Sequence, residues 1–368
     1  MQNNNYWNDS KNRAIKAKEW VDKMEKEHPS EIAYSVKNTM ICRKENLDSS
    51  FGVSWQKRCS QTAVKLEALD SVSAVFKYTD QSSKTAVLNF ASYKQPGGMF
   101  LQGSKAQEEC LCHESTLYNV LRKFDSTYYA RNRKALNRAL YQNVALYSPD
   151  IYFERNDDST ECDVITCAAP NFSAASRYCN VSREENTDVL KSRIKFILYL
   201  AATQQVDTLI LGAFGSGVFG QDAKEVAEIT MNLLKHYDGV FKEVVFAVID
   251  EKSANYQAFN YVIGTTKYAN EYLQDSLMPN DKIAEILSRL LDEMELPTNL
   301  YEQVFDLYKR AALLYFGKKH NLTILPELLI TSDEITGTLG QLLDEVDLPP
   351  DLYNQVQDLY SRVAKLLE

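Results

Sequence analysis

The chain has 368 residues, of which 45% are apolar and 25% charged, so it is long enough for two domains and apolar enough to bury a core. Its net charge of −9 argues against general nucleic-acid binding and against binding to anionic membrane surfaces. An anionic ligand would need backbone N–H groups or a single basic residue. No segment has the roughly 18 consecutive apolar residues of a membrane span, and no secretion signal is recognised at the N-terminus.

The first 265 residues show the alternation of an α/β domain. An amphipathic helix is predicted over 9–28. Short, nearly continuous apolar runs then predict strands over 85–91, 162–170, 206–214 and 241–250, and helical spacing predicts helices over 184–205 and 222–238. Strands that alternate with helices favour a layered α/β fold.

The loop that follows the strand over 85–91 is the first candidate site. Asn89 is polar among apolar neighbours near the end of that strand, and Gly97 and Gly98 permit backbone geometry that side chains forbid. Shortly after Gly98 come Glu108 and Glu109. Ligands of α/β sheets bind beyond the carboxyl ends of strands, which places this loop at a site. Taken alone, a glycine pair is a turn and two adjacent glutamates are a solvated helix N-terminus.

The cysteines support no metal site. The "CLCH" stretch at 110–113 invites a metal interpretation, but no second pair has zinc spacing, and alternation between core and surface on a helix accounts for it equally well. All seven cysteines are expected to be reduced thiols of a cytoplasmic protein. The chain is expected to need no metal or other cofactor.

A second glycine-rich loop separates the strand over 206–214 from the next helix. Its glycines at 212, 215, 217 and 220 suit a row of backbone N–H donors, aided by the helix N-terminus that follows, which would hold a diphosphate without adding net charge. The loop is neither a Walker A loop nor a first-turn dinucleotide fingerprint. A connection with no ligand is the alternative.

The last hundred residues change character. From about residue 280 strand signals stop, and 290–308 aligns with 342–360 at an offset of 52, with 13 of 19 positions identical. Each copy is predicted to be a helical hairpin broken at proline, with apolar positions such as Ile283, Ile286 and Leu287 in the first copy. The pair is interpreted as a structural or oligomerising appendage, or else as a module for a protein partner.

The two loops, in this order, resemble those of bacterial-type poly(ADP-ribose) glycohydrolases, which have the macrodomain fold. The resemblance is carried by "LNFA", by Gly97-Gly98-Met99 followed after seven residues by Gln107-Glu108-Glu109, by "STLY" and by "LGAFGSGVFG", and it spans residues 30 to 265. Met99 departs from it, because the family usually has a third glycine there. The resemblance implies a three-layer α/β/α domain with a mixed sheet over 1–270, with an N-terminal helical extension. It does not cover the repeat, whose own pattern predicts an all-helical tandem-repeat domain over 271–368.

The resemblance also implies the roles of residues. Glu109 is expected to be the general acid that protonates the leaving oxygen and then activates water, and Glu108 to hydrogen-bond ribose hydroxyls. Burial and a neighbouring charge should raise a carboxyl pKa in this pair. The adenine partner is left open, with acidic residues near 33–48 or at 70 as candidates. The expected substrate-binding residues are Asn89, Gly97, Gly98, Gln107, Gly212, Gly215, Ser216, Gly217, Val218, Phe219 and Gly220.

Three functions remain to be separated. The first is hydrolysis of the ribose–ribose bond of poly(ADP-ribose), or of other O-linked ADP-ribose conjugates such as ADP-ribosylated protein, with ADP-ribose as the product. The second is a module that binds ADP-ribose without cleaving it, although such a module has no need of Gln-Glu-Glu. The third is a scaffold whose helical repeat is the functional part.

Phe219 is expected to contact the adenosine portion, or else to be an ordinary core aromatic.

Overall fold

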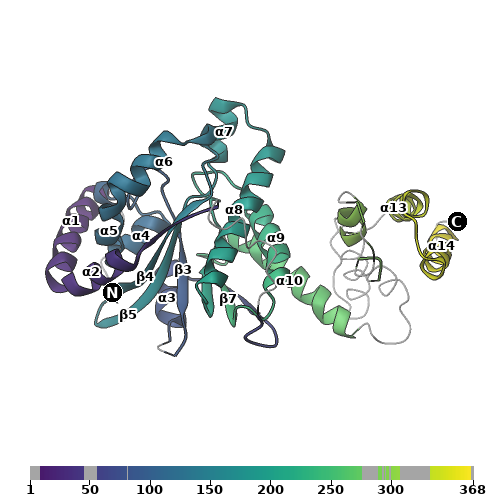
Figure 1. Cartoon of the computed structure of the whole chain (residues 1–368), viewed down its shortest axis with the longest axis horizontal. Helices are drawn as coiled ribbons and strands as arrows, with labels where there is room; N and C mark the ends of the chain where they lie inside the picture. The colour runs from purple at the N-terminus through teal and green to yellow at the C-terminus, as the bar shows by residue number, and fades with distance from the viewer. Residues whose placement is uncertain are drawn as a thin grey trace. The chain divides into compact units, whose positions relative to one another are not determined.

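A computed structural model of the chain describes residues 9–44, 56–80, 82–275, 289–291, 294, 296–297, 300–306 and 332–365 (Figure 1). The chain divides into two compact units, 1–263 and 264–368. The predicted boundary at residue 270 lies inside a helix that crosses this division, and the predicted domain limits stay a prediction. Among the described residues, no helix is long and apolar enough to cross a membrane.

The first unit contains a mixed seven-stranded sheet, as expected, with the strand order β1-β4-β5-β3-β6-β7-β2. Strands β5, β3, β6, β7 and β2 run parallel to one another, whereas β4 is antiparallel to both β5 and β1. The strands are β1 (Met40–Arg43), β2 (Ala63–Glu67), β3 (Thr85–Phe90), β4 (Val144–Arg155), β5 (Asp158–Cys167), β6 (Thr208–Leu211) and β7 (Glu243–Ala247).

The sequence predicts β3, β5, β6 and β7 but misses the other three strands. Edge strands β1 and β2 are short and half-exposed, so they lack the continuous apolar run of a strand that is buried on both faces. Strand β4 is interrupted by a bulge between Ser148 and Ile151, where Asp150 has a φ of 50°. Irregularities of this kind remove the periodicity on which strand prediction depends.

Helices cover both faces of the sheet, in agreement with the expected three layers (Figure 1). Alternate residues of the central strands point to opposite faces: Ala86 and Leu88 pack with α8, α9 and α10, whereas Val87 packs with α1 to α5. These helices are α1 (Ser10–Glu27), α2 (Pro29–Asn38), α3 (Ser71–Tyr78), α4 (Gln107–His113), α5 (Leu117–Leu121), α8 (Arg183–Thr203), α9 (Ala223–Leu234) and α10 (Ala254–Asp275). The long helices predicted over 9–28, 184–205 and 222–238 are thereby confirmed as α1, α8 and α9.

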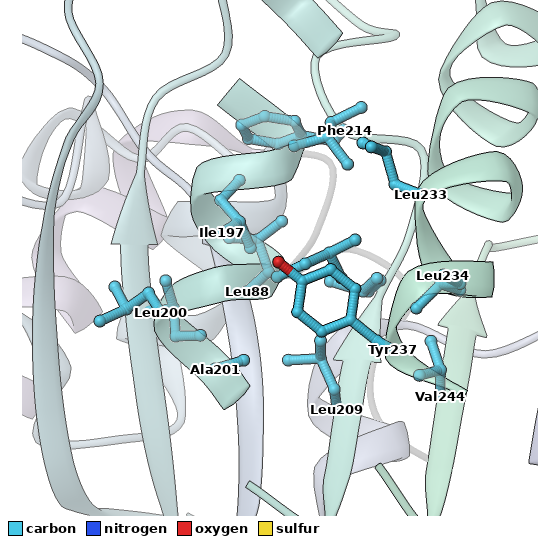
Figure 2. Packing of buried hydrophobic residues seen from close by; sticks show 14 of the residues in the cluster. Leu88, Ile197, Leu200, Ala201, Leu209, Phe214, Leu233, Leu234, Tyr237 and Val244 are labelled. Atoms are coloured by element: carbon cyan, nitrogen blue, oxygen red, sulfur yellow. The ribbon is translucent and has the colours of Figure 1, made fainter. Parts of the chain in front are cut away.

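Short elements connect these layers. They are η3 (Phe100–Gln102), η4 (Arg122–Phe124), the π-helical turn η5 (Asp125–Tyr129), α6 (Ala130–Lys134), η6 (Asn137–Ala139), α7 (Phe172–Cys179) and η7 (Lys235–Tyr237). Figure 2 shows how the α8–α9 face closes over the sheet: Leu88, Leu209 and Val244 of the strands meet Ile197, Leu200 and Leu234 of the helices.

The second unit is helical over most of its described residues. The second copy of the repeat forms α13 (Ser332–Glu345) and α14 (Pro350–Lys365), with the proline-containing break between them. Of the first copy, 289–291 and 300–306 are helical, and the predicted positions Ile283, Ile286 and Leu287 lie outside the described residues. Apolar residues of both copies, among them Leu290, Val304, Leu339 and Leu352, share one buried cluster.

Candidate active site

The parallel strands β5, β3 and β6 end at the same edge of the sheet, and this brings the two glycine loops together. Asn89 of β3 lies opposite Thr166 of β5, and Val87 lies opposite Ile210 of β6. The ring of Phe90, the last residue of β3, meets that of Phe214 in the second loop, with centroids 5.6 Å apart. The loop over 91–106 and the loop over 212–222 therefore flank one site at the carboxyl edge, where α/β sheets bind ligands.

The first glycine turn requires glycine at both predicted positions. Gly97 and Gly98 have φ angles of +66° and +56°. A Cβ on Gly97 would lie 2.7 Å from the Tyr118 ring, and one on Gly98 would lie 2.5 Å from Glu109 Oε1. Met99, in contrast, has a φ of −103°, which any side chain tolerates, so the methionine does not disturb the path of the turn.

The two glutamates occupy the first turn of α4, and both are buried, so they are not a solvated helix end. Glu109 Oε1 accepts a hydrogen bond from the backbone N–H of Met99 at 2.8 Å, while its Oε2 is buried without a partner among the described residues. Glu108 Oε2 accepts from the N–H of Ser92 at 2.7 Å. Because a Cβ on Gly98 would touch both carboxylates, the two groups lie side by side against this glycine.

The expected rise in pKa is found at Glu108. Burial raises the pKa of its carboxyl to about 8, and the charge of Glu109 adds to the rise, whereas hydrogen bonds from Ser92 and Asn89 oppose it. Glu108 therefore keeps its proton at pH 7. Since the pKa is raised on folding from 4.5, this group makes the fold less stable as the pH rises from about 4.5 to about 8.

Asn89 and Gln107 hold the pair in place. Asn89 is fully buried, and its Nδ2 donates to Glu108 Oε1 and to Thr166 Oγ1, both at 3.3 Å. Gln107 accepts from the N–H of Phe90 at 2.8 Å and donates to Ser71 Oγ and the Leu88 carbonyl, which ties α4 to the end of β3. The Gln107 amide thus braces the glutamates through the strand, whereas a ribose contact by Asn89 stays a prediction.

The second glycine loop contains two kinds of glycine. Gly215 and Gly220 have φ angles of +78° and +70°, and a Cβ on Gly215 would lie 2.7 Å from Ala169. At Gly212 a Cβ would lie 2.6 Å from the Ala247 carbonyl oxygen, so close packing on β7 excludes side chains there. Gly217 differs: its φ is not positive, and no atom lies within 4 Å of a Cβ built on it. Neither backbone geometry nor packing therefore requires a glycine at position 217.

The loop presents a row of backbone donors. Among the described residues, the N–H groups of Gly215, Gly217, Val218 and Phe219 donate to no protein acceptor, whereas those of Ser216 and Gly220 bond within the loop. Val218 is 85% exposed. The Oγ of Ser216 is buried without a protein partner in the described part of the chain. Phe219 is half-buried and meets Tyr141 edge-on at 6.1 Å. Unused N–H groups in one short loop suit an anion.

Several supporting residues carry no signal in the sequence. Thr166 and Ser92 hold Asn89 and Glu108, but threonine is common in strands and serine in loops whether or not a site is near. Asp70, a candidate adenine partner, instead caps α3 and pairs with Arg155. The "CLCH" cysteines and histidine join no metal-ligand cluster within the described ranges. Within this stretch, burial lowers the pKa of the His113 imidazole to about 4.

Comparisons with known proteins agree with this geometry. Residues 8–156 match the family model of the microbial-type PARG catalytic domain. The structure is similar to poly(ADP-ribose) glycohydrolase from Thermomonospora curvata bound to the inhibitor ADP-HPD, with 31% identity and a TM-score of 0.61, over 68% of this chain and 98% of that one.

A second similar structure is poly(ADP-ribose) glycohydrolase from Deinococcus radiodurans in complex with ADP-ribose, with 30% identity and a TM-score of 0.58, over 64% of this chain and 98% of that one. No curated protein matches the sequence. The matched residues 8–156 include α1, and the description of this helix as an N-terminal extension stays a prediction.

Proposed function

We propose that this chain, which belongs to the microbial-type poly(ADP-ribose) glycohydrolase family, hydrolyses the ribose–ribose bond of poly(ADP-ribose) with Glu109 as its general acid and base. The observation that carries the assignment is the asymmetry of the Glu109 carboxylate. One oxygen accepts from the Met99 N–H, and the other is buried with no described protein partner. A buried carboxylate oxygen without a partner is costly unless a substrate atom bonds to it.

The reaction then uses one carboxyl twice. Glu109 gives its proton to the glycosidic oxygen as the bond to the anomeric carbon breaks, and positive charge develops on that ribose ring. The resulting carboxylate takes a proton from a water molecule as the water oxygen bonds to the anomeric carbon. The products are ADP-ribose and a chain with one unit fewer, and the carboxyl is regenerated.

Glu108 has a different task, since adjacent side chains on a helix diverge. Its oxygens already accept from Ser92 and Asn89, and its raised pKa keeps it neutral at pH 7. A neutral carboxyl can donate a hydrogen bond to a ribose hydroxyl. We therefore assign Glu108 to ribose orientation.

The loop over 212–220 is assigned to the diphosphate. Its uncommitted N–H groups provide donors for an anion without a basic side chain. Phe219, whose ring meets that of Tyr141 edge-on, is assigned to the adenosine portion.

Gly217→Val tests this loop. Open space surrounds the position, and its φ suits any residue, so the melting temperature should stay close to that of the native protein. ADP-ribose affinity should fall more than tenfold, because the side chain crowds N–H groups whose charge-assisted bonds are worth about 1.5–3 kcal/mol each. Calorimetric titration and thermal melting measure the two effects.

The matched control is Val218→Ala, which trims the exposed neighbour and keeps every backbone N–H. It should bind ADP-ribose as the native protein does. If Gly217→Val also binds normally, the loop is only a connection and the anion site lies elsewhere.

One incubation separates the competing functions. Released ADP-ribose, measured by chromatography after mixing with poly(ADP-ribose), supports the glycohydrolase. Retention of the polymer without release supports a non-catalytic binding module. A parallel incubation with a peptide carrying one serine-linked ADP-ribose tests the alternative of other O-linked conjugates, because chain cleavage and peptide release have separate products.

The helical unit is proposed to be dispensable for turnover. Ending the chain after residue 270 should leave a folded and active enzyme, because the α10 side chains that enter the sheet's core, Phe259 and Val262, precede the cut. The second unit has a buried cluster of its own. Thermal melting and turnover of the fragment provide the test, and an insoluble or inactive fragment would show that later residues complete the catalytic unit. A protein partner for the repeat and a cytoplasmic location both stay predictions.

A further inference from the structure

Helix α1 contacts the loop that contains Met99, whose backbone N–H donates a hydrogen bond to the proposed acid, Glu109. The Nε of Arg13 donates to the carbonyl oxygen of Gly103 at 2.6 Å, and Arg13 is only 7% exposed. Gly103 has a φ of +78°, and a Cβ on it would collide with the carbonyl oxygen of Ser10 in the first turn of α1. The backbone of the loop thus packs directly on the backbone of the helix, with a buried guanidinium beside it.

The same loop is fixed on its other side by α4. Phe100 is fully buried, and its ring meets the ring of His113 edge-on, with centroids 4.6 Å apart. His113 is the last residue of α4, the helix whose first turn carries both glutamates. The segment over 99–104 therefore lies between α1 and α4, and its first residue, Met99, donates the N–H that holds Glu109 Oε1.

We infer that Arg13 is a positioning residue for hydrolysis: by holding the Gly103 carbonyl it fixes η3, and η3 fixes the Met99 N–H that orients the Glu109 carboxylate. Two backbone hydrogen bonds join the end of this segment to its beginning. The N–H of Gly103 donates to the Phe100 carbonyl at 2.9 Å, and the N–H of Ser104 donates to the Met99 carbonyl at 3.1 Å. A displacement of the Gly103 carbonyl is consequently transmitted to Met99 within one turn.

The inference rests on the proposed role of Glu109, and the size of the expected loss of rate follows from the geometry. A catalytic group that is misplaced by about 1 Å loses up to 10²-fold in rate. Arg13 holds the carbonyl of this loop, and its charge helps to lower the pKa of His113 at the end of α4, whereas the proposed diphosphate donors of 212–220 belong to a different loop. Loss of Arg13 should therefore lower the rate of the bond-breaking step and leave ligand binding largely intact.

The experiment compares Arg13→Met, Arg13→Lys and the control Lys18→Met in the full chain. Lys18 is an exposed residue of the same helix, so its variant removes one positive charge from α1 without touching the loop. Arg13→Met should lower kcat about 10- to 100-fold, with KM for poly(ADP-ribose) and the Kd for ADP-ribose within about threefold. Arg13→Lys, which can still donate to the carbonyl, should recover most of kcat, and Lys18→Met should match the native enzyme.

A purely structural role predicts a different result. In that case kcat per folded molecule stays constant, and only the melting temperature and the folded fraction fall. That result, or a parallel loss of ADP-ribose binding, would overturn the inference. If Arg13→Met does not fold, Arg13→Lys decides: a several-fold lower kcat at native ADP-ribose affinity supports the positioning role, and a kcat equal to that of the native enzyme assigns Arg13 to folding. Glu109→Gln in the same assay tests the acid separately, because full turnover there refutes the acid whatever Arg13 does.

Discussion

Glu109→Gln is expected to lower the turnover of poly(ADP-ribose) by about 10²–10⁴-fold, the range over which general acid–base catalysis contributes. The amide has the shape of the carboxyl, and its oxygen can still accept the Met99 N–H that Glu109 Oε1 accepts at 2.8 Å. It cannot give up a proton as an acid or take one from water. The loss should therefore appear in kcat, while ADP-ribose affinity changes only a few-fold.

The measurement pairs steady-state release of ADP-ribose with calorimetric titration of the same preparations. Glu19→Gln makes the same chemical change at an exposed position of α1 and should leave both quantities unaltered. Near-native turnover by Glu109→Gln would mean that another group supplies the proton. The neighbouring carboxyl of Glu108 would then be the first candidate, since its pKa of about 8 keeps it protonated at pH 7.

The sequence predicts the two glycine loops and the glutamates of this site better than the residues that hold them in place. Gly97, Gly98, Glu108 and Glu109 lie within thirteen residues of one another, so a linear motif captures both the glycine turn and the buried carboxylates beside it. The end of β3 is recognisable because a strand buried on both faces has a continuous apolar run. Both features depend on residues that are close together in the chain, so they can be recognised from the sequence alone.

The supporting contacts are not local. Thr166 meets Asn89 because β5 pairs with β3 in one register, and Arg13 meets Gly103 because α1 packs on the loop 90 residues later. No local pattern in a single sequence reveals that two such distant residues are in contact. The edge strands β1 and β2 are missed for a related reason: half-exposed edge strands have no distinctive pattern until a partner strand is known.

The glycine loop over 212–220 shows the same limit at the level of single residues. All its glycines look alike in the sequence. In the structure Gly215 and Gly220 serve left-handed backbone, and Gly212 permits close packing. Gly217 has neither constraint. The reason for a glycine depends on φ and on neighbours from other elements, and neither is written in the loop itself.

Gly98→Ala is the sharpest test of the geometry around the carboxylates. One methyl group would lie 2.5 Å from Glu109 Oε1 and 3.0 Å from Glu108 Oε2, at a φ of +56°. Left-handed backbone costs alanine about 1–2 kcal/mol, which a domain of this size tolerates. The methyl must therefore displace both carboxylates, and displacement by about 1 Å is expected to lower turnover about 100-fold or more.

Met99→Ala is the matched control for this change. It removes a side chain that is 50% exposed at a φ of −103°, and it keeps the N–H that Glu109 accepts. Turnover and melting temperature of the two variants should therefore diverge: Met99→Ala should stay within a few-fold of the native rate, and Gly98→Ala should lose activity while its melting temperature falls by only several degrees. An active Gly98→Ala would show that the carboxylates can move aside without cost, and a fixed position of Glu109 would then no longer explain why the turn needs glycine.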